Sequence, residues 1–477
     1  MVSILKASLA LVALLFGSVS ALADSLPNIL FIYTDDQAPT AIGLDNPQLR
    51  TPHIDRIFNE GARLRNAFVT TPVCSPSRAS LMTSRYASEL RIHDWINPYK
   101  EPDHGLDPDT VTWPELLVSA GYTNGLVGKW HLGTATRFHP TRMGFHYFMG
   151  FLSGGSRPKD PDLEVAGKNR KVEGFTPDLL TDDAIAFVRR QRSAPFLLCL
   201  HFRAPHAKWL PVRDVDLAPY KNLDPDIPVS DLPYLDVEKV KRMTREYYAS
   251  VASVDRNVGR LLAELDRLKL TEDTVVIFTS DHGYNLGHHG LWYKGNAQWQ
   301  LTRLPKQEWP NIPPLQRPNL FDQSLRVPTA VRWPARIKPG LEVTETVSNL
   351  DWFPTLLAIA GVKLPRGLVV RGRNILPLLQ GLPPEGKART WDNSLYAEYA
   401  MRYGARTEMR AWRTPKWKLM IDFLNDGRAE LYDLEHDPAE SRNLIDSKEP
   451  RIQGVRARLR ERILDRMREL KDPVANS

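Results

Sequence analysis

Short runs of apolar residues recur along the chain and predict buried strands. Residues 29–34 (ILFIYT), 195–202 (PFLLCLHF) and 274–280 (TVVIFTS) each have the length of one strand and carry mostly apolar side chains at consecutive positions. Strands with this pattern are covered on both faces, as in a parallel sheet between two layers of helices. Residues 123–128 predict a further strand.

Longer segments with apolar residues three or four positions apart predict helices between these strands. The clearest is at 237–268, where the apolar face consists of Val240, Met243, Tyr247, Val251, Val254, Val258, Leu261 and Leu265. Capping and stop residues predict further helices at 52–60, 112–120 and 351–360, one that opens at 181–183, and one at 451–470.

This alternation predicts an α/β fold with a large, mainly parallel sheet sandwiched by helices. A Pro- and Gly-rich passage at 364–386 separates it from short patterns such as KWKLMIDF and AELYDL. These patterns predict a smaller C-terminal α+β domain with a short antiparallel sheet. We therefore expect a large domain at 24–385 and a C-terminal domain at 386–477.

The first residues have the pattern of a cleavable secretory signal peptide. Lys6 precedes an apolar run at 7–19, and Ala21-Leu22-Ala23 forms an A-x-A cleavage site. We expect residues 1–23 to be removed and the protein to be secreted or periplasmic. An uncleaved anchor or a buried first helix is the alternative, but we expect no stable membrane insertion, since no later run is long and apolar enough.

The composition is that of a globular protein, with 42% hydrophobic and 25% charged residues among 477. The net charge of +7 favours anionic partners, although a generally basic surface would explain it equally well. The chain has no long Lys/Arg block and no nucleic-acid-binding motif, so we expect no nucleic-acid partner.

Acidic residues directly follow two of the predicted strands. Asp35 and Asp36 come after the first strand, and Asp281 comes after the strand at 274–280. In parallel sheets, binding sites lie at the carboxyl ends of the strands. Three carboxylates gathered there would repel one another unless they bind a cation, although each alone could be a turn or helix cap.

The two cysteines lie in different surroundings. Cys199 is inside an apolar run and suits a buried position, whereas Cys74 stands in the polar segment TTPVCSPSR. Pro76 fits the first turn of a helix, which would place residue 74 at a helix N-terminus, where peptide dipoles favour an anion. A disulfide between the two cysteines is the alternative in an exported protein.

The segment CSPSR fits C-x-P-x-R, the signal by which sulfatases have a cysteine oxidised to formylglycine. Further segments occur in the order of the type I sulfatase family, namely PNILFIYTDDQ, GKWHLG, APH, SDHG, GLWYKG, LRVP and LYDLEHDPAESRNL. The chain thus resembles this formylglycine-dependent, arylsulfatase-like family of the alkaline phosphatase superfamily. The resemblance implies an alkaline phosphatase-like fold and hydrolysis of sulfate esters.

The resemblance also implies one Ca²⁺ ion held by Asp35, Asp36, Asp281 and residue 74. His282 would be a further ligand, or it would orient Asp281, since many members carry an amide there. Cys74 would be converted to 3-oxoalanine (formylglycine) by a formylglycine-generating enzyme. One hydroxyl of its hydrate would attack sulfur, and loss of the other hydroxyl's proton would then expel sulfate.

Five more residues match catalytic positions of the family. Arg78 would support residue 74 and the metal, unless it only caps a loop. Lys129 and His131 lie in GKWHLG, His206 lies in RAPH and Lys294 lies in GLWYKG. His206 and Lys294 would bind the sulfate, and either His206 or His131 would protonate the leaving alcohol.

Two loops carry residues that suit sulfated sugars, so a sulfated carbohydrate or aryl sulfate is the expected substrate. The insert at 296–319 carries Trp299, Trp309, Arg303, Lys306 and Arg317, and the loop at 154–174 carries Arg157, Lys159, Lys168, Arg170 and Lys171. For the insert, packing over the C-terminal domain is the alternative. Two other functions remain open: a phosphonate monoester or phosphodiester hydrolase of the same superfamily, and a non-catalytic glycan-binding protein.

Overall fold

The computed structural model describes residues 26–228, 235–301, 309–384 and 390–476. The expected signal peptide and residues 302–308 of the insert, which include Arg303 and Lys306, lie outside these ranges. No helix within the ranges combines the length and the hydrophobicity needed to cross a bilayer.

The strands of the large sheet lie in the order β10-β2-β9-β8-β1-β7-β3-β4-β5-β6. Their bounds are β1 Asn28–Thr34, β2 Ala62–Phe68, β3 Thr123–Lys129, β4 Tyr147–Phe151, β5 Asp162–Val165, β6 Lys168–Lys171, β7 Phe196–His201, β8 Thr274–Ser280, β9 Thr329–Arg332 and β10 Leu341–Ser348. The central strands β8, β1, β7, β3 and β4 are parallel. The predicted α/β fold is confirmed, whereas the antiparallel strands β5, β6 and β9 were not predicted.

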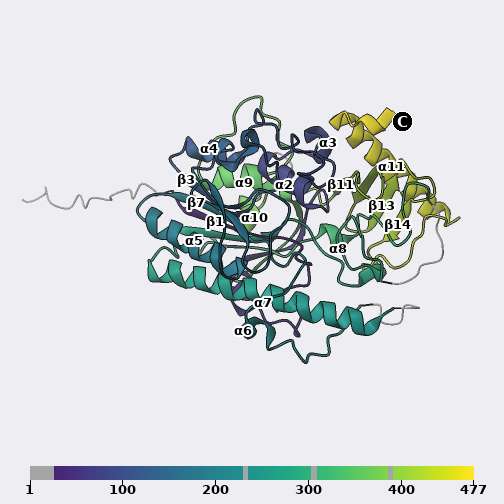
Figure 1. Cartoon of the computed structure of the whole chain (residues 1–477). Helices are drawn as coiled ribbons and strands as arrows, with labels where there is room; N and C mark the ends of the chain where they lie inside the picture. The colour runs from purple at the N-terminus through teal and green to yellow at the C-terminus, as the bar shows by residue number, and fades with distance from the viewer. Residues whose placement is uncertain (1–25, 229–234, 302–308, 385–389, 477) are drawn as a thin grey trace, which may run out of the picture.

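Helices cover both faces of this sheet (Figure 1). On β1, Phe31 packs into a core shared with α2 (Cys74–Thr83), α4 (Trp113–Val118) and α9 (Trp352–Ile359). Its neighbour Ile32 faces the opposite core, shared with α1 (Pro52–Asn59), α5 (Thr176–Gln191) and α7 (Val237–Arg267). Because both faces are buried, the strands need apolar residues at consecutive positions, as the sequence pattern predicted.

The helix predictions hold with one correction. α7 ends within one residue of its predicted end, and all eight residues of its predicted apolar face are buried. The helix predicted to open at 181–183 begins earlier, at Thr176. Pro177 lies in the first turn of the helix, where the N–H that proline lacks would have no partner within the helix. The helix thus starts before the acidic residues at 182 and 183, which lie inside it.

The C-terminal part forms a four-stranded antiparallel sheet, as predicted, and ends in a long helix (Figure 1). Its elements are β11 Leu395–Tyr399, β12 Met409–Arg413, β13 Trp417–Asp422, β14 Glu430–Asp433 and α11 Pro450–Leu470. Short helices complete the fold: α3 Ala87–Leu90, α6 Asp214–Leu217, α8 Asp322–Leu325 and α10 Leu376–Leu379. Ion pairs join α8 to the smaller sheet, since Asp322 contacts Arg413 of β12 and Lys418 of β13 at 2.9 Å.

Candidate active site

The strand register brings the predicted acidic residues together. β1 and β8 are adjacent and parallel, and Thr34 pairs with Ser280, so the residues that follow each strand lie side by side. The backbone N–H of Asp36 donates to Oδ1 of Asp281 over 3.3 Å. Asp35, Asp36 and Asp281 are all fully buried.

Tyr247 of α7 holds the loop that carries Asp36. Its hydroxyl donates to the carbonyl oxygen of Asp36 over 2.7 Å and accepts from the N–H of Ala38 over 2.9 Å. Asp36 adopts a left-handed φ of 68°, which Asp tolerates better than most residues. The apolar periodicity of α7 predicted that Tyr247 is buried, but it carried no signal for the hydrogen bonds of the Tyr247 hydroxyl.

Cys74 is the first residue of α2, as Pro76 predicted. Its buried Sγ lies 3.6 Å from Oδ1 of Asp35 and 3.4 Å from Nε2 of His282, and accepts from Nζ of Lys294 over 3.1 Å. Burial raises the pKa of the thiol, but the Lys129 and Lys294 cations outweigh it and hold the pKa well below its ordinary value.

Cys74 and Cys199 are both free, so the disulfide alternative is wrong. Cys199 lies on the buried strand β7, where burial raises its pKa well above the ordinary value. It therefore serves packing, as its apolar sequence context predicted.

Three cations surround the acidic cluster. Lys129, at the end of β3, contacts Oδ2 of Asp35 at 2.7 Å, and Lys294 contacts Oδ1 of Asp36 at 2.7 Å. The Nε of Arg78 donates to Oδ2 of Asp281 over 2.9 Å. Its Nη1 donates to the carbonyl oxygen of Lys129 over 3.0 Å, so Arg78 does more than cap a loop. All three cations are buried, and together they can attract and hold an anion.

The three predicted histidines reach the cluster from different loops. Nε2 of His282 lies 3.2 Å from Oδ1 of Asp36 and 3.4 Å from Oδ1 of Asp281. Burial lowers the pKa of His282, but Asp281 outweighs it and raises the pKa to about 9. Nε2 of His206 lies 4.0 Å from Oδ2 of Asp36, with 19% of the side chain exposed. His131 is buried, and its Nε2 lies 3.1 Å from the carbonyl oxygen of Ile96.

The residues present fit a hard divalent cation. Ligand atoms of Asp35, Asp36, Cys74 and His282 all lie within 4.8 Å of one another. Asp281 is outside this set of four, although it contacts two of its members. Oδ2 of Asp36 is buried and has no hydrogen-bond partner in the described part of the chain. An unpaired buried carboxylate oxygen beside other acids is suited to Ca²⁺.

A cleft of about 590 Å³ opens beside this cluster. Ala207, the residue after His206, lines this cleft. Ser153 and Gly155 also line it, and Gly154 between them packs on the ring of His131. Tyr99 stands on its rim with 95% of its surface exposed. The cleft is therefore the approach for a substrate larger than an inorganic anion.

The two loops with aromatic and basic residues lie in different places. Arg157 of the 154–174 loop lines the cleft, whereas Lys168 and Lys171 lie on β6 at the sheet edge, outside the cleft lining. In the insert, Trp309 donates to the carbonyl oxygen of Asp426 over 3.2 Å, so this end packs against the C-terminal domain. Trp299 is 40% exposed and lies 5.1 Å, between ring centroids, from Tyr293, the neighbour of Lys294.

A buried cysteine at a helix N-terminus, encircled by cations and acids, is an arrangement suited to binding an anionic ester. The family model for sulfatases matches residues 27–362, which is more than half of the chain. A second model, the C-terminal domain of N-sulphoglucosamine sulphohydrolase, matches residues 316–469. The chain belongs to the sulfatase family, and it is a sulfuric ester hydrolase.

Several relatives are similar over most of their length. The N-acetylglucosamine-6-O-sulfatase of Bacteroides thetaiotaomicron is 27% identical, and the alignment covers 88% of this chain and 82% of that protein. The N-acetylgalactosamine-6-sulfatase of Canis lupus familiaris is 31% identical over 76% of this chain and 68% of that protein. A solved structure of a protein bound to its substrate, D-glucosamine-2-N,6-O-disulfate, superposes with a TM-score of 0.78 at 25% identity, covering 94% of this chain and 99% of that one.

Proposed function

We propose that the protein is an exported sulfatase that removes sulfate from sulfated carbohydrates, using a formylglycine formed from Cys74 and one Ca²⁺ ion. The observation that carries the proposal is the position of Cys74, at a helix N-terminus and in contact with both the acidic cluster and Lys294. The sulfated sugars named for the similar proteins support the substrate class.

The Ca²⁺ ion, held by Asp35, Asp36, Asp281, His282 and residue 74, would polarise the sulfate, while the hydrated formylglycine would supply the attacking oxygen. A sulfate ester carries anionic oxygens that repel a nucleophile, so the site must neutralise them before attack. Lys129 and Lys294 place two ammonium groups beside residue 74 for this purpose. Arg78 holds the carboxylate of Asp281 and the end of β3 in position.

The leaving alcohol needs a proton, and we assign its delivery to His206. The Nδ1 of His206 lies 2.6 Å from the carbonyl oxygen of Ala207 and donates to it, so the proton for the alcohol must come from Nε2 of the imidazolium form. Burial lowers the pKa of His206, whereas the nearby carboxylates of Asp36 and Asp35 oppose this effect and favour the imidazolium. His206 also has 19% of its side chain exposed, whereas His131 is only 3% exposed and its Nε2 already faces the carbonyl oxygen of Ile96. His131 would then contact the sulfate group or residue 74 through Nδ1, which is buried without a hydrogen-bond partner among the described residues.

Two measurements test the proposal. Intact-mass analysis of the peptide that contains residue 74, purified from the native host in active form, should show the loss of the thiol and the gain of an aldehyde. A screen of defined sulfated mono- and oligosaccharides should then reveal release of inorganic sulfate. Active protein with an unmodified thiol would exclude the proposed nucleophile, and a preference for aryl phosphonates over every sulfate ester would exclude the proposed reaction.

A further inference from the structure

The cleft beside the active site contains a buried arginine that forms no ion pair with any acidic residue the structure describes. Arg203 follows β7 and belongs to the same turn as His206, whose N–H donates to the carbonyl oxygen of Arg203 over 3.0 Å. Only 5% of Arg203 is exposed, yet the side chain lines the cleft. In the sequence, Arg203 is the first residue of the segment RAPH, where only the histidine had a predicted role.

The guanidinium of Arg203 has unused hydrogen-bond donors. Nη1 donates to the carbonyl oxygen of Lys208 over 2.7 Å, whereas Nε is buried with no partner in the described part of the chain. Among the same residues no carboxylate forms an ion pair with it. Burial lowers the pKa of Arg203 to about 10, although Asp35 and Asp36 raise it, so the group is a cation at neutral pH.

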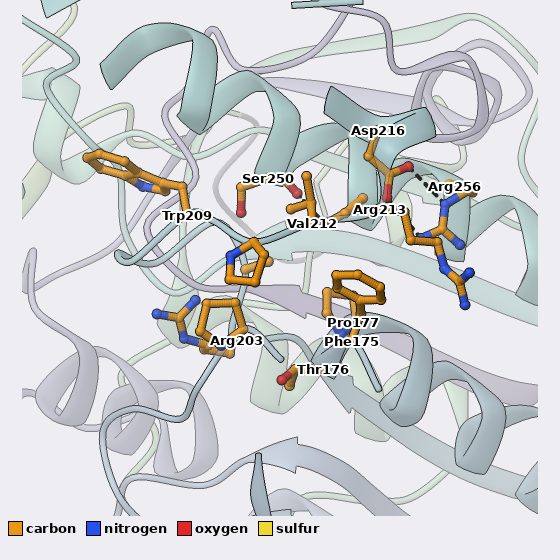
Figure 2. Close-up of a pocket in the computed structure, with 14 residues that line it drawn as sticks. Phe175, Thr176, Pro177, Arg203, Trp209, Val212, Arg213, Asp216, Ser250 and Arg256 are labelled. Carbon is orange, nitrogen blue, oxygen red and sulfur yellow. Dashed lines mark hydrogen bonds and ion pairs between the residues drawn. The ribbon is translucent and has the colours of Figure 1, made fainter. Parts of the chain in front are cut away.

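Other arginines nearby are fully paired, which makes Arg203 unusual. Arg256 contacts Asp216 at 2.8 Å and Asp178 at 2.7 Å, and Arg213 also contacts Asp178. Figure 2 shows Arg256 joined to Asp216, with the guanidinium of Arg203 pointing away from this pair. A buried cation without a partner destabilises a fold, so an anion from outside the chain is the natural partner for Arg203.

The rest of the cleft fits an anion attached to a sugar. Lys208 is exposed at the cleft and forms no ion pair in the described ranges, and Arg157 adds a cation that contacts Asp162 at 2.9 Å. Three basic residues therefore face one acidic residue in the cleft lining. The exposed ring of Tyr99 at the rim offers a surface on which a sugar can stack.

We infer that Arg203, with Lys208 at its side, binds a second anionic group of the substrate, next to the sulfate that is hydrolysed. The preferred substrate is therefore a saccharide that carries at least two negative groups close together, such as two sulfates. This inference rests on the proposed function, since it assumes that a sulfated sugar enters the cleft. A planar guanidinium matches the oxygens of a sulfate or carboxylate with two parallel hydrogen bonds.

The test compares two substrates that differ only in the second anion. For a singly sulfated sugar that the wild-type enzyme hydrolyses, kcat/KM is measured again on the same sugar with one additional sulfate. We expect the wild type to prefer the doubly sulfated sugar about tenfold or more, as for one charge-assisted contact. Added salt should reduce this preference.

Arg203→Gln should abolish the preference and leave kcat/KM for the singly sulfated sugar within about twofold of wild type. Arg213→Gln is the matched control, because it removes an arginine that is paired with Asp178 and lies outside the cleft lining. It should retain the preference. If Arg203→Gln does not fold, Lys208→Gln takes its place. This variant should show a smaller preference for the doubly sulfated sugar than the wild type.

Two results would overturn the inference. One is a wild-type enzyme that does not prefer the doubly sulfated sugar. Another is an Arg203→Gln variant that loses equal activity on both sugars, since that would assign Arg203 to the hydrolysed sulfate or to folding. A wild-type enzyme with formylglycine that hydrolyses no sulfated sugar would instead contradict the proposed function, and it would do so before any variant is made.

Discussion

Gly154 packs against the ring of His131, so its replacement by alanine tests this histidine without altering its side chain. A Cβ at residue 154 would lie 2.6 Å from both Cε1 and Nε2 of His131. Ordinary contact begins at 3.4 Å, so the ring must move by about 0.8 Å. The ring is buried and its Nε2 lies 3.1 Å from the carbonyl oxygen of Ile96, so this movement breaks a contact that orients it.

We expect kcat of Gly154→Ala on 4-nitrophenyl sulfate to fall about 10- to 100-fold, as for a catalytic group displaced by about 1 Å. This corresponds to about 1.4 to 2.7 kcal/mol of transition-state stabilisation. The backbone of Gly154 is not in the left-handed region, so alanine is permitted there. The lost hydrogen bond costs about 1 kcal/mol, and the reduced freedom of the unfolded chain offsets part of it, so the melting temperature should change little.

Gly155→Ala is the matched control. A Cβ at that position would meet no atom of the described residues within 4 Å, and this variant should keep wild-type activity on this small substrate. Mass spectrometry must show equal formylglycine content in all three proteins, so that a defect in maturation is not mistaken for a defect in catalysis. Full activity in Gly154→Ala, or an equal loss in Gly155→Ala, would refute the role assigned to His131.

Four further outcomes are expected. Cys74→Ala should abolish sulfate release while leaving the fold intact, as measured by circular dichroism; residual turnover above about one part in a thousand would contradict its role as nucleophile precursor. Removal of Ca²⁺ by a chelator should lower both activity and melting temperature, and added Ca²⁺ should restore both; a chelator-treated enzyme with unchanged activity would exclude the metal. His206→Ala should reduce kcat about 100-fold or more on a sugar sulfate but far less on 4-nitrophenyl sulfate, whose leaving group needs no proton; equal losses would speak against proton donation. Asp322→Asn should lower the free energy of unfolding by about 1 to 3 kcal/mol, because Arg413 loses its carboxylate partner and the buried Lys418 keeps only Glu440.

The pH dependence of stability provides a second measurement on Asp322. Burial raises its pKa, but Arg413 and Lys418 outweigh it and hold the pKa well below its ordinary value. The unfolded chain therefore takes up a proton near pH 4, where the folded protein does not, and stability is lost as the pH falls further. Urea unfolding at pH 7 and pH 3 should show this loss in the wild type and a smaller loss in Asp322→Asn.

Much of the fold could be predicted from local patterns. The apolar strands and the eight-residue face of α7 were identified because burial on a regular element leaves a periodic trace in the sequence. Pro76 likewise placed Cys74 at the start of a helix. The start of α5 was predicted several residues too late, because the acidic pair at 182–183 resembles the first turn of a helix, whereas the helix begins next to Pro177.

The sequence by itself determined the buried central strands and the apolar face of α7, and it indicated which side chains could form the site. Only the tertiary structure decided that Thr34 pairs with Ser280, so that Asp35 and Asp281 meet, and that Arg203 forms no ion pair with any described carboxylate. Secondary structure depends on neighbours within a few positions, and these leave a pattern in the chain. A pairing register, or the lack of a partner, depends on atoms from segments hundreds of residues apart, and no local pattern records where those atoms lie.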